Sequence, residues 1–200
     1  MKNYSLVLTV LFSSMLTGCA VNLPFNNRLN YTSVSQLSEI QKTKEVITIK
    51  WNPNTFPQRI DVQGADGFVG GGSRTRIPTG VALSSRIEEA LSQFVQLSPN
   101  GNPLTITVES ARSGFEYSAG IFNVTPAIDV ANVTFTATFE YKGEKWSKTF
   151  TSKLKDPKIG GSSQTGLLDS AWDDIAVQVA KDVASVSYTH LRAHETREDL

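Results

Sequence analysis

The feature that most constrains the fold is a strict alternation of apolar and polar side chains between residues 132 and 141, within a predicted strand over 130–141. The apolar members occupy one face of a predicted strand and are Val133, Phe135, Ala137, Phe139 and Tyr141. Their neighbours, mostly threonines, would lie on the opposite face, because successive side chains of a strand point to opposite sides. The pattern predicts an antiparallel sheet with one face in the core and the other in water.

A second run of the same period follows this strand directly. Lys142-Gly143 fits a tight turn, and Trp146, Phe150 and Leu154 share one face of the run that follows. The two runs therefore predict a β-hairpin. Residues 104–108 alternate in the same way, and β-branched residues at 45–51 predict an earlier strand. A short strand is also expected at 59–62.

Two amphipathic helices accompany these strands. The first carries an apolar stripe at helical spacing, formed by Ile87, Ala90, Leu91, Phe94 and Val95. Its start is ambiguous, because Thr79 could cap it and Ser85 with Glu88 also has capping-box spacing. The second has a stripe formed by Leu168, Ala171, Trp172, Ile175, Val179 and Val183. Asp169, Asp173 and Lys181 would lie on its polar side.

These elements predict a single α+β domain over residues 45–184, with two amphipathic helices packed on one face of a mostly antiparallel sheet. A chain of 200 residues with 40% hydrophobic side chains is large enough for one core. Its 19 basic and 19 acidic residues give no cationic excess, which argues against a nucleic-acid-binding protein. Its one cysteine excludes an intramolecular disulfide.

The first nineteen residues explain that cysteine. Lys2 precedes an apolar run from Leu6 to Leu16, which is too short to cross a bilayer and fits a signal peptide. The run ends in Leu16-Thr17-Gly18-Cys19, which resembles the lipobox of bacterial lipoproteins. The resemblance implies removal of residues 1–18 by cleavage between Gly18 and Cys19, and covalent attachment of diacylglycerol and an N-acyl chain to Cys19. The alternative is an ordinary secretory signal followed by a buried cysteine.

The residues after the predicted anchor indicate its destination. Ala20 follows Cys19, and the sorting rule of enteric-type lipoproteins places a protein without Asp at this position in the outer membrane. We expect the domain to lie on the periplasmic face. Residues 19–44 are polar and show no sustained period, so we interpret them as a tether between the lipid and the domain.

The last sixteen residues do not match the rest of the chain. Residues 185–200 contain both histidines, His190 and His194, and interrupt the period of the preceding helix. They resemble a peptide that recurs at the ends of unrelated predicted proteins as a translation of sequencing-adapter read-through. We therefore expect this tail to be non-native and assign it no metal site, since its order is also not His-Glu-x-x-His.

Candidate site residues are few, and each has a plain structural alternative. A glycine-rich loop at 67–72 with Arg74 and Arg76 nearby could contact an acidic partner, although it could equally be an ordinary surface loop. The aromatic residues Phe139, Trp146 and Phe150 are candidates for partner binding if exposed and core residues otherwise.

Catalytic residues are not evident. Without the tail the chain has no histidine, which excludes a Ser-His-Asp triad. The adjacent acids Glu88-Glu89 and Asp173-Asp174 diverge on their helices. We interpret both pairs as solvated helix faces rather than as an acid–base pair.

Several of these parts occur together in one known group of proteins. They are the lipobox, the helix at 85–97, Asn100-Gly101, the strands at 104–108, 132–141 and 146–154, and the helix at 168–183. In this order they resemble the YajG-type uncharacterised lipoproteins of the outer membrane, mainly over residues 104–184. The resemblance implies the lipid anchor and the α+β plan, and it carries over no catalytic residue.

The sequence thus favours a non-enzymatic, lipid-anchored periplasmic accessory or binding lipoprotein that contacts another envelope protein through a sheet edge or its polar sheet face. The alternative is a carrier or sensor of a small envelope ligand, such as a lipid or glycan fragment. A sizeable apolar pocket would favour the carrier. A filled core with an open strand edge would favour protein contact.

Overall fold

The computed structural model describes residues 20–64, 74–116, 128–156 and 163–198, with side chains in the last range up to Val186. Gly18, Cys19 and the glycine-rich loop at 67–72 lie outside these ranges. The larger sheet has five strands in the order β5-β2-β6-β7-β8. Their bounds are Gln96–Leu97, Val46–Asn52, Asn102–Glu116, Asp129–Tyr141 and Glu144–Asp156.

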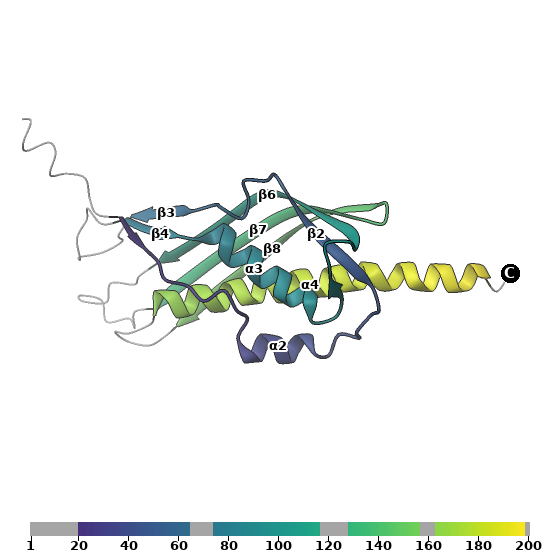
Figure 1. Cartoon of the computed structure of the whole chain (residues 1–200). Coiled ribbons are helices and arrows are strands. Elements are labelled where there is room, and N and C mark those ends of the chain that lie inside the picture. The colour runs from purple at the N-terminus through teal and green to yellow at the C-terminus, as the bar shows by residue number, and fades with distance from the viewer. Residues whose placement is uncertain (1–19, 65–73, 117–127, 157–162, 199–200) are drawn as a thin grey trace, which may run out of the picture.

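A smaller sheet of three strands lies at one end of the molecule (Figure 1). It has the order β1-β4-β3, with bounds Ala20–Asn22, Arg74–Ile77 and Asp61–Gly64. Three helices among the described residues complete the fold, namely α2 (Tyr31–Leu37), α3 (Thr79–Ser92) and α4 (Gln164–Glu198). The predicted α+β class is confirmed.

The hairpin forms as the sequence predicts. β7 and β8 pair in antiparallel register, with Phe139 opposite Trp146 and Tyr141 opposite Glu144. Lys142 and Gly143 both have positive φ, 50° and 86°, which is the geometry of a two-residue type I′ turn. Glycine adopts this conformation without a steric penalty. β6 extends the antiparallel pairing on the other side of β7.

The sheet is mixed rather than purely antiparallel. β2 runs parallel to β6, with Ile49 opposite Leu104, and β5 adds two residues in parallel to the other edge of β2. α3 begins at Thr79 with Pro78 before it, and no side-chain hydrogen bond caps it. The helix therefore starts at Thr79 and not at Ser85, but neither residue caps it: Pro78 holds the N-cap position, and the hydroxyl of Thr79 donates to Asp61 at 2.8 Å.

The core lies between the inner face of the sheet and the helices α3 and α4 (Figure 1). Trp172 of α4 is fully buried, and the inner-face residues Phe135 and Phe139 are fully buried as well. The outer face is polar: the hydroxyl oxygens of Thr136 and Thr149 lie 3.0 Å apart across the strand pair. The larger sheet therefore has one buried face and one polar face toward solvent, as the sequence predicts.

Residues 20–44 differ from the predicted polar tether. They form β1 and α2, and three of their leucines, Leu23, Leu29 and Leu37, are buried in the core cluster. The side chain of Asn30 caps α2 by accepting a hydrogen bond from the backbone N–H of Ser33 at 2.8 Å. The few leucines are too widely spaced to show a period, but each one fills a gap between elements. The tether prediction is wrong for this segment.

α4 continues without a break into the expected non-native tail. Its last buried side chains are Val183 and Ala184, and beyond them the helix runs past the end of the sheet (Figure 1). That residues 185–200 are non-native stays a prediction. No helix within the described ranges combines the length and apolar character needed to cross a membrane.

Candidate functional site

The aromatic residues proposed as a partner-binding cluster lie beneath α4. Phe139 and Phe150 are 0% and 2% exposed, and their rings meet edge to face with centroids 6.1 Å apart. Trp146 stacks on Phe139 at 5.3 Å, and its indole N–H donates to the carboxylate of Asp182 on α4 at 2.9 Å. This corrects the partner-binding interpretation, because side chains covered by a helix belong to the core.

Arg74 and Arg76 are exposed on β4, which belongs to the small sheet. The sequence predicts them as part of a loop over residues 64–80, and the structure corrects this because residues 74–77 form a strand. β4 pairs with both β1 and β3. The structure does not bring these arginines together with the aromatic trio, because the two groups lie in different sheets.

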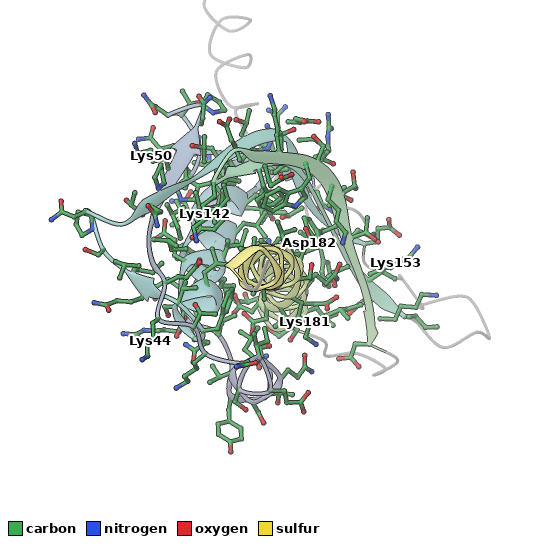
Figure 2. All side chains as sticks on the ribbon, turned by 90° about the vertical axis from the view of Figure 1, so that its right-hand side faces the viewer. Lys44, Lys50, Lys142, Lys153, Lys181 and Asp182 are labelled. Carbon is green, nitrogen blue, oxygen red and sulfur yellow. The ribbon has the colours of Figure 1, made fainter. Side chains whose placement is uncertain are left out.

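The free edge of β8 is the longest open strand edge of the larger sheet. β8 is the end strand of that sheet and pairs with β7 over all 13 of its residues. Lys145, Lys153 and Lys155 are exposed along it and form no ion pair with another described residue. Figure 2 shows Lys153 projecting from β8 away from α4. Lysines on an edge strand discourage pairing with a second copy of the same edge.

α4 contacts the β8 edge at a few defined points. The ammonium group of Lys148 pairs with the carboxylate of Asp182. The side-chain amide of Gln178 donates to the backbone carbonyl of Thr151 at 3.1 Å, which satisfies one of the edge's acceptors. No described strand pairs with the other side of β8, which is therefore the side that an added segment could use.

A second open stretch occurs on β6, beside a cleft. β2 stops pairing with β6 at Thr107. Further along, the carboxylate of Asp61 accepts from the backbone N–H of Ser113 at 2.8 Å, and the amide of Gln63 bonds to the backbone of Phe115. Between these bridges, residues 108–111 contain a β-bulge and border a cleft of about 510 Å³. Phe56, Arg59, Ile60 and Glu109 are among its lining residues.

A buried charged cluster joins the helices. The guanidinium of Arg86 donates from Nε to Asp173 at 2.7 Å and from Nη2 to Asp169 at 2.6 Å. It also lies 5.3 Å from the ring centre of Trp172. Arg86 is 0% exposed and Asp173 is 2% exposed, so the interpretation of Asp173 as part of a solvated helix face is wrong.

The same cluster holds the segment that leads into α2. The backbone N–H of Asn30 donates to Asp173 at 3.0 Å, and that of Leu29 donates to Glu89 at 2.8 Å. Burial raises the pKa of the Asp173 and Asp169 carboxyls, while the charge of Arg86 acts in the opposite direction. The guanidinium and carboxylate groups named here all have hydrogen-bond partners within the protein, so we interpret the cluster as structural. Its sequence signal was the placement of Asp169 and Asp173 four residues apart.

The described residues hold no group of three or more His, Cys, Asp or Glu side chains that could bind a metal ion. The β8 edge and the cleft beside residues 108–111 are candidate surfaces for a partner or ligand in the described part of the chain. The first suits an extended polypeptide and the second suits a small molecule.

Comparison with known proteins gives likenesses of fold. No family model matches the chain, and no curated protein matches it. The structure is similar to a minor lipoprotein from Acinetobacter baumannii, with 13% identity, a TM-score of 0.44, and coverage of 74% of this chain and 96% of that one. It is similar to a Xanthomonas campestris protein of the family DUF330, with 14% identity, a TM-score of 0.47, and coverage of 88% and 99%.

A third likeness is to uncharacterised lipoprotein B from Nitrosomonas europaea, with 12% identity, a TM-score of 0.45, and coverage of 86% of this chain and 97% of that one. All three likenesses have TM-scores below 0.5, so they assign this chain to no class of protein. Identities at this level do not define a family, and the YajG-type assignment stays a prediction.

Proposed function

We propose that this protein is a lipid-anchored accessory lipoprotein of the bacterial cell envelope, without enzymatic activity, that binds another envelope protein along the free edge of β8. The predicted lipid on Cys19 would hold it at the periplasmic face of the outer membrane. The observation that carries the binding proposal is the open edge of the 13-residue strand β8.

An open edge suits binding because it presents a row of backbone donors and acceptors. An extended segment of a partner can add to such an edge as a further strand, in which case main-chain hydrogen bonds supply affinity and flanking side chains supply specificity. The core beneath β8 is filled by Phe150 and Trp146, so this part of the sheet is a rigid template. Binding then requires no rearrangement of β8.

The lysines of the edge indicate the chemistry of the partner. Lys145, Lys153 and Lys155 are spread along the strand and lack a carboxylate partner among the described residues. They repel an identical edge and attract an acidic segment, because complementary charge favours the correct partner and disfavours others. We therefore expect the bound segment to be extended and acidic.

Site-specific photocrosslinking in the native host tests this proposal. A photoreactive amino acid replaces Thr151 on β8 or, as a control position, Thr105 on β6, in the full chain. We expect one dominant crosslinked envelope protein from Thr151 and not from Thr105. Lys153→Glu combined with Lys155→Glu should abolish that crosslink, whereas Lys50→Glu, a matched exposed lysine on β2, should preserve it. Equal crosslinking from both positions, or insensitivity to the double reversal, would contradict binding at the β8 edge.

The cleft beside residues 108–111 supports a second candidate, a carrier or sensor of a small envelope ligand. Its volume of about 510 Å³ is in the range of small-molecule sites. Its lining combines the apolar Phe56 and Ile60 with the polar Arg59 and Glu109, which suits an amphiphilic ligand such as a lipid or glycan fragment.

Native mass spectrometry of protein extracted gently from membranes tests the carrier function. A retained small molecule that is lost in Ser110→Lys, which places a long side chain in the cleft, and kept in Thr134→Lys on β7 would support it. Protein that carries no small molecule, together with the Thr151 crosslink, would exclude the carrier in favour of the accessory protein.

A further inference from the structure

The small sheet exposes an unusual share of the protein's apolar side chains. Val21, Ile60 and Val62 are 59%, 55% and 56% exposed, and they lie in this sheet or directly beside it. They are three of the seven large hydrophobic residues that are exposed in the described part of the chain. Single exposed apolar residues are ordinary, whereas a local concentration of them marks a contact surface.

Strand register determines which side chains share the outer face of this sheet. Val62 lies opposite Arg76, and Gly64 lies opposite Arg74. The alternate residues turn inward: Ile77 is fully buried, and Asp61 bonds to the backbone of β6. Because alternate residues of a strand point to opposite sides, Arg74, Arg76 and Val62 face solvent together.

The charges of these two arginines are not neutralised within the described residues. The nearby Arg59 donates to the carboxylate of Asp61 at 2.8 Å, whereas Arg74 and Arg76 form no ion pair with a described residue. The outer face of the small sheet therefore combines the exposed side chain of Val62 with two guanidinium groups that have no ion-pair partner among the described residues. This combination suits a surface that has phosphate groups above a hydrocarbon layer. Val21 lies opposite Thr75 and points to the other face.

The position of the predicted anchor identifies that surface. β1 begins at Ala20, the residue directly after Cys19, and Ala20 is the Cα partner of Arg74. One extended residue spans about 3.3 Å. A lipid on Cys19 would thus enter the membrane beside Arg74, with no free linker in between. Figure 1 places this sheet at one end of the molecule, opposite the C-terminal end of α4.

We propose that the outer face of the small sheet is a membrane-docking surface. Arg74 and Arg76 contact lipid phosphates, while Val62 lies in the interfacial layer, so the domain is held in one orientation rather than moving freely around its anchor. The proposal rests on the lipid anchor of the proposed function. It leaves the hairpin turn of β7 and β8 pointing away from the bilayer.

Fluorescence quenching tests the docked orientation. The lipidated full chain is reconstituted in vesicles of phosphatidylethanolamine and phosphatidylglycerol, with a fluorophore-bearing residue in place of Val62 or, as a control, of Glu140 beside the hairpin turn. Lipids with a nitroxide on the headgroup should quench the label at position 62 and not the label at 140. Equal quenching at both positions would overturn the proposal.

The arginines are tested in the same vesicles. Each basic side chain near an anionic surface contributes about 1 kcal/mol, so Arg74→Gln and Arg76→Gln should each lower the ratio of docked to undocked protein about fivefold. The matched control is Lys50→Gln, an exposed basic residue on β2 of the larger sheet, which should leave the quenching unchanged. Quenching at position 62 that survives the double substitution would also overturn the proposal.

Failure of docking is distinguishable from failure of the anchor. If the chain acquires no lipid, it will not float with vesicles, and the proposed function fails. Docking is then measured on protein whose Cys19 thiol is coupled to a maleimide-bearing phospholipid, with the same two label positions and the same expected contrast.

Discussion

The guanidinium of Arg86 and the carboxylate of Asp173 form an ion pair inside the protein, with Nε and Oδ1 2.7 Å apart and side-chain exposures of 0% and 3%. The pair links α3 to α4, and the second oxygen of Asp173 accepts the backbone N–H of Asn30. A single carboxylate therefore ties together two helices and the segment that follows the predicted anchor.

Removing the positive member of this pair should destabilise the fold strongly. Arg86→Met leaves Asp169 and Asp173 without their counter-charge, and breaking a buried pair in this way costs about 3–5 kcal/mol. Urea unfolding at neutral pH measures the loss. Arg112→Met is the control, because this arginine is exposed on the outer sheet face and its loss should change the free energy of unfolding by about 0.5 kcal/mol or less.

The loss of unfolding free energy caused by Arg86→Met, called the deficit below, should also depend on pH. The charge of Arg86 lowers the pKa of both carboxyls, so its removal raises their folded-state pKa further above the unfolded value. Groups with a raised folded-state pKa stabilise the fold below the unfolded pKa and lose that contribution as the pH rises. The deficit should therefore shrink as the pH falls toward the ordinary carboxyl pKa of 3.8. A deficit that stays constant or grows on acidification would contradict this.

The segment after the predicted anchor should behave as part of the domain. Leu37 of α2 is fully buried, and Leu37→Ala removes side-chain atoms from a packed site, which typically costs about 2–5 kcal/mol. Tyr31→Ala on the same helix is the matched control, since Tyr31 is 88% exposed. Chemical denaturation should show a large loss for the first variant and almost none for the second. Similarly small losses for both variants would instead support the interpretation of this segment as a tether.

Residues 185–200 should contribute little to stability. The last buried side chains of α4 are Val183 and Ala184, so a chain that ends at Ala184 keeps the packed part of the helix. We expect its free energy of unfolding to fall by less than about 2 kcal/mol. A larger loss in thermal or chemical unfolding would show that the tail is an integral part of the fold.

The longest periodic segments were the easiest to predict from the sequence. The alternation through Phe135 and Phe139 predicted β7 and the face of β7 that lies in the core. With a side-chain period of two, only one of the two faces can bury all the apolar residues, and the same argument identified the hairpin partner. The stripe of Leu168, Trp172 and Ile175 specified α4 in the same way. In these segments local pattern and tertiary burial agree.

The elements that were missed are short or depend on distant pairing. β1 and β4 have three and four residues, which is too few to establish a period. β1 pairs only with β4, and β4 pairs with both β1 and β3. The parallel pairing of β2 with β6 likewise cannot be detected in either strand alone. Asp173 lies on the polar side of its own helix. It is buried because α3 packs against this side and Arg86 of α3 pairs with it.

The central claim, that the protein is held in the envelope by a lipid on Cys19, has one direct test. Cells that express the full chain or Cys19→Ser are given labelled palmitate, and both proteins are followed through membrane fractionation. The lipid anchor predicts label and membrane association for the wild type, with neither for Cys19→Ser. A Cys19→Ser protein that still fractionates with membranes, alongside a wild type that takes up no palmitate, would contradict the claim.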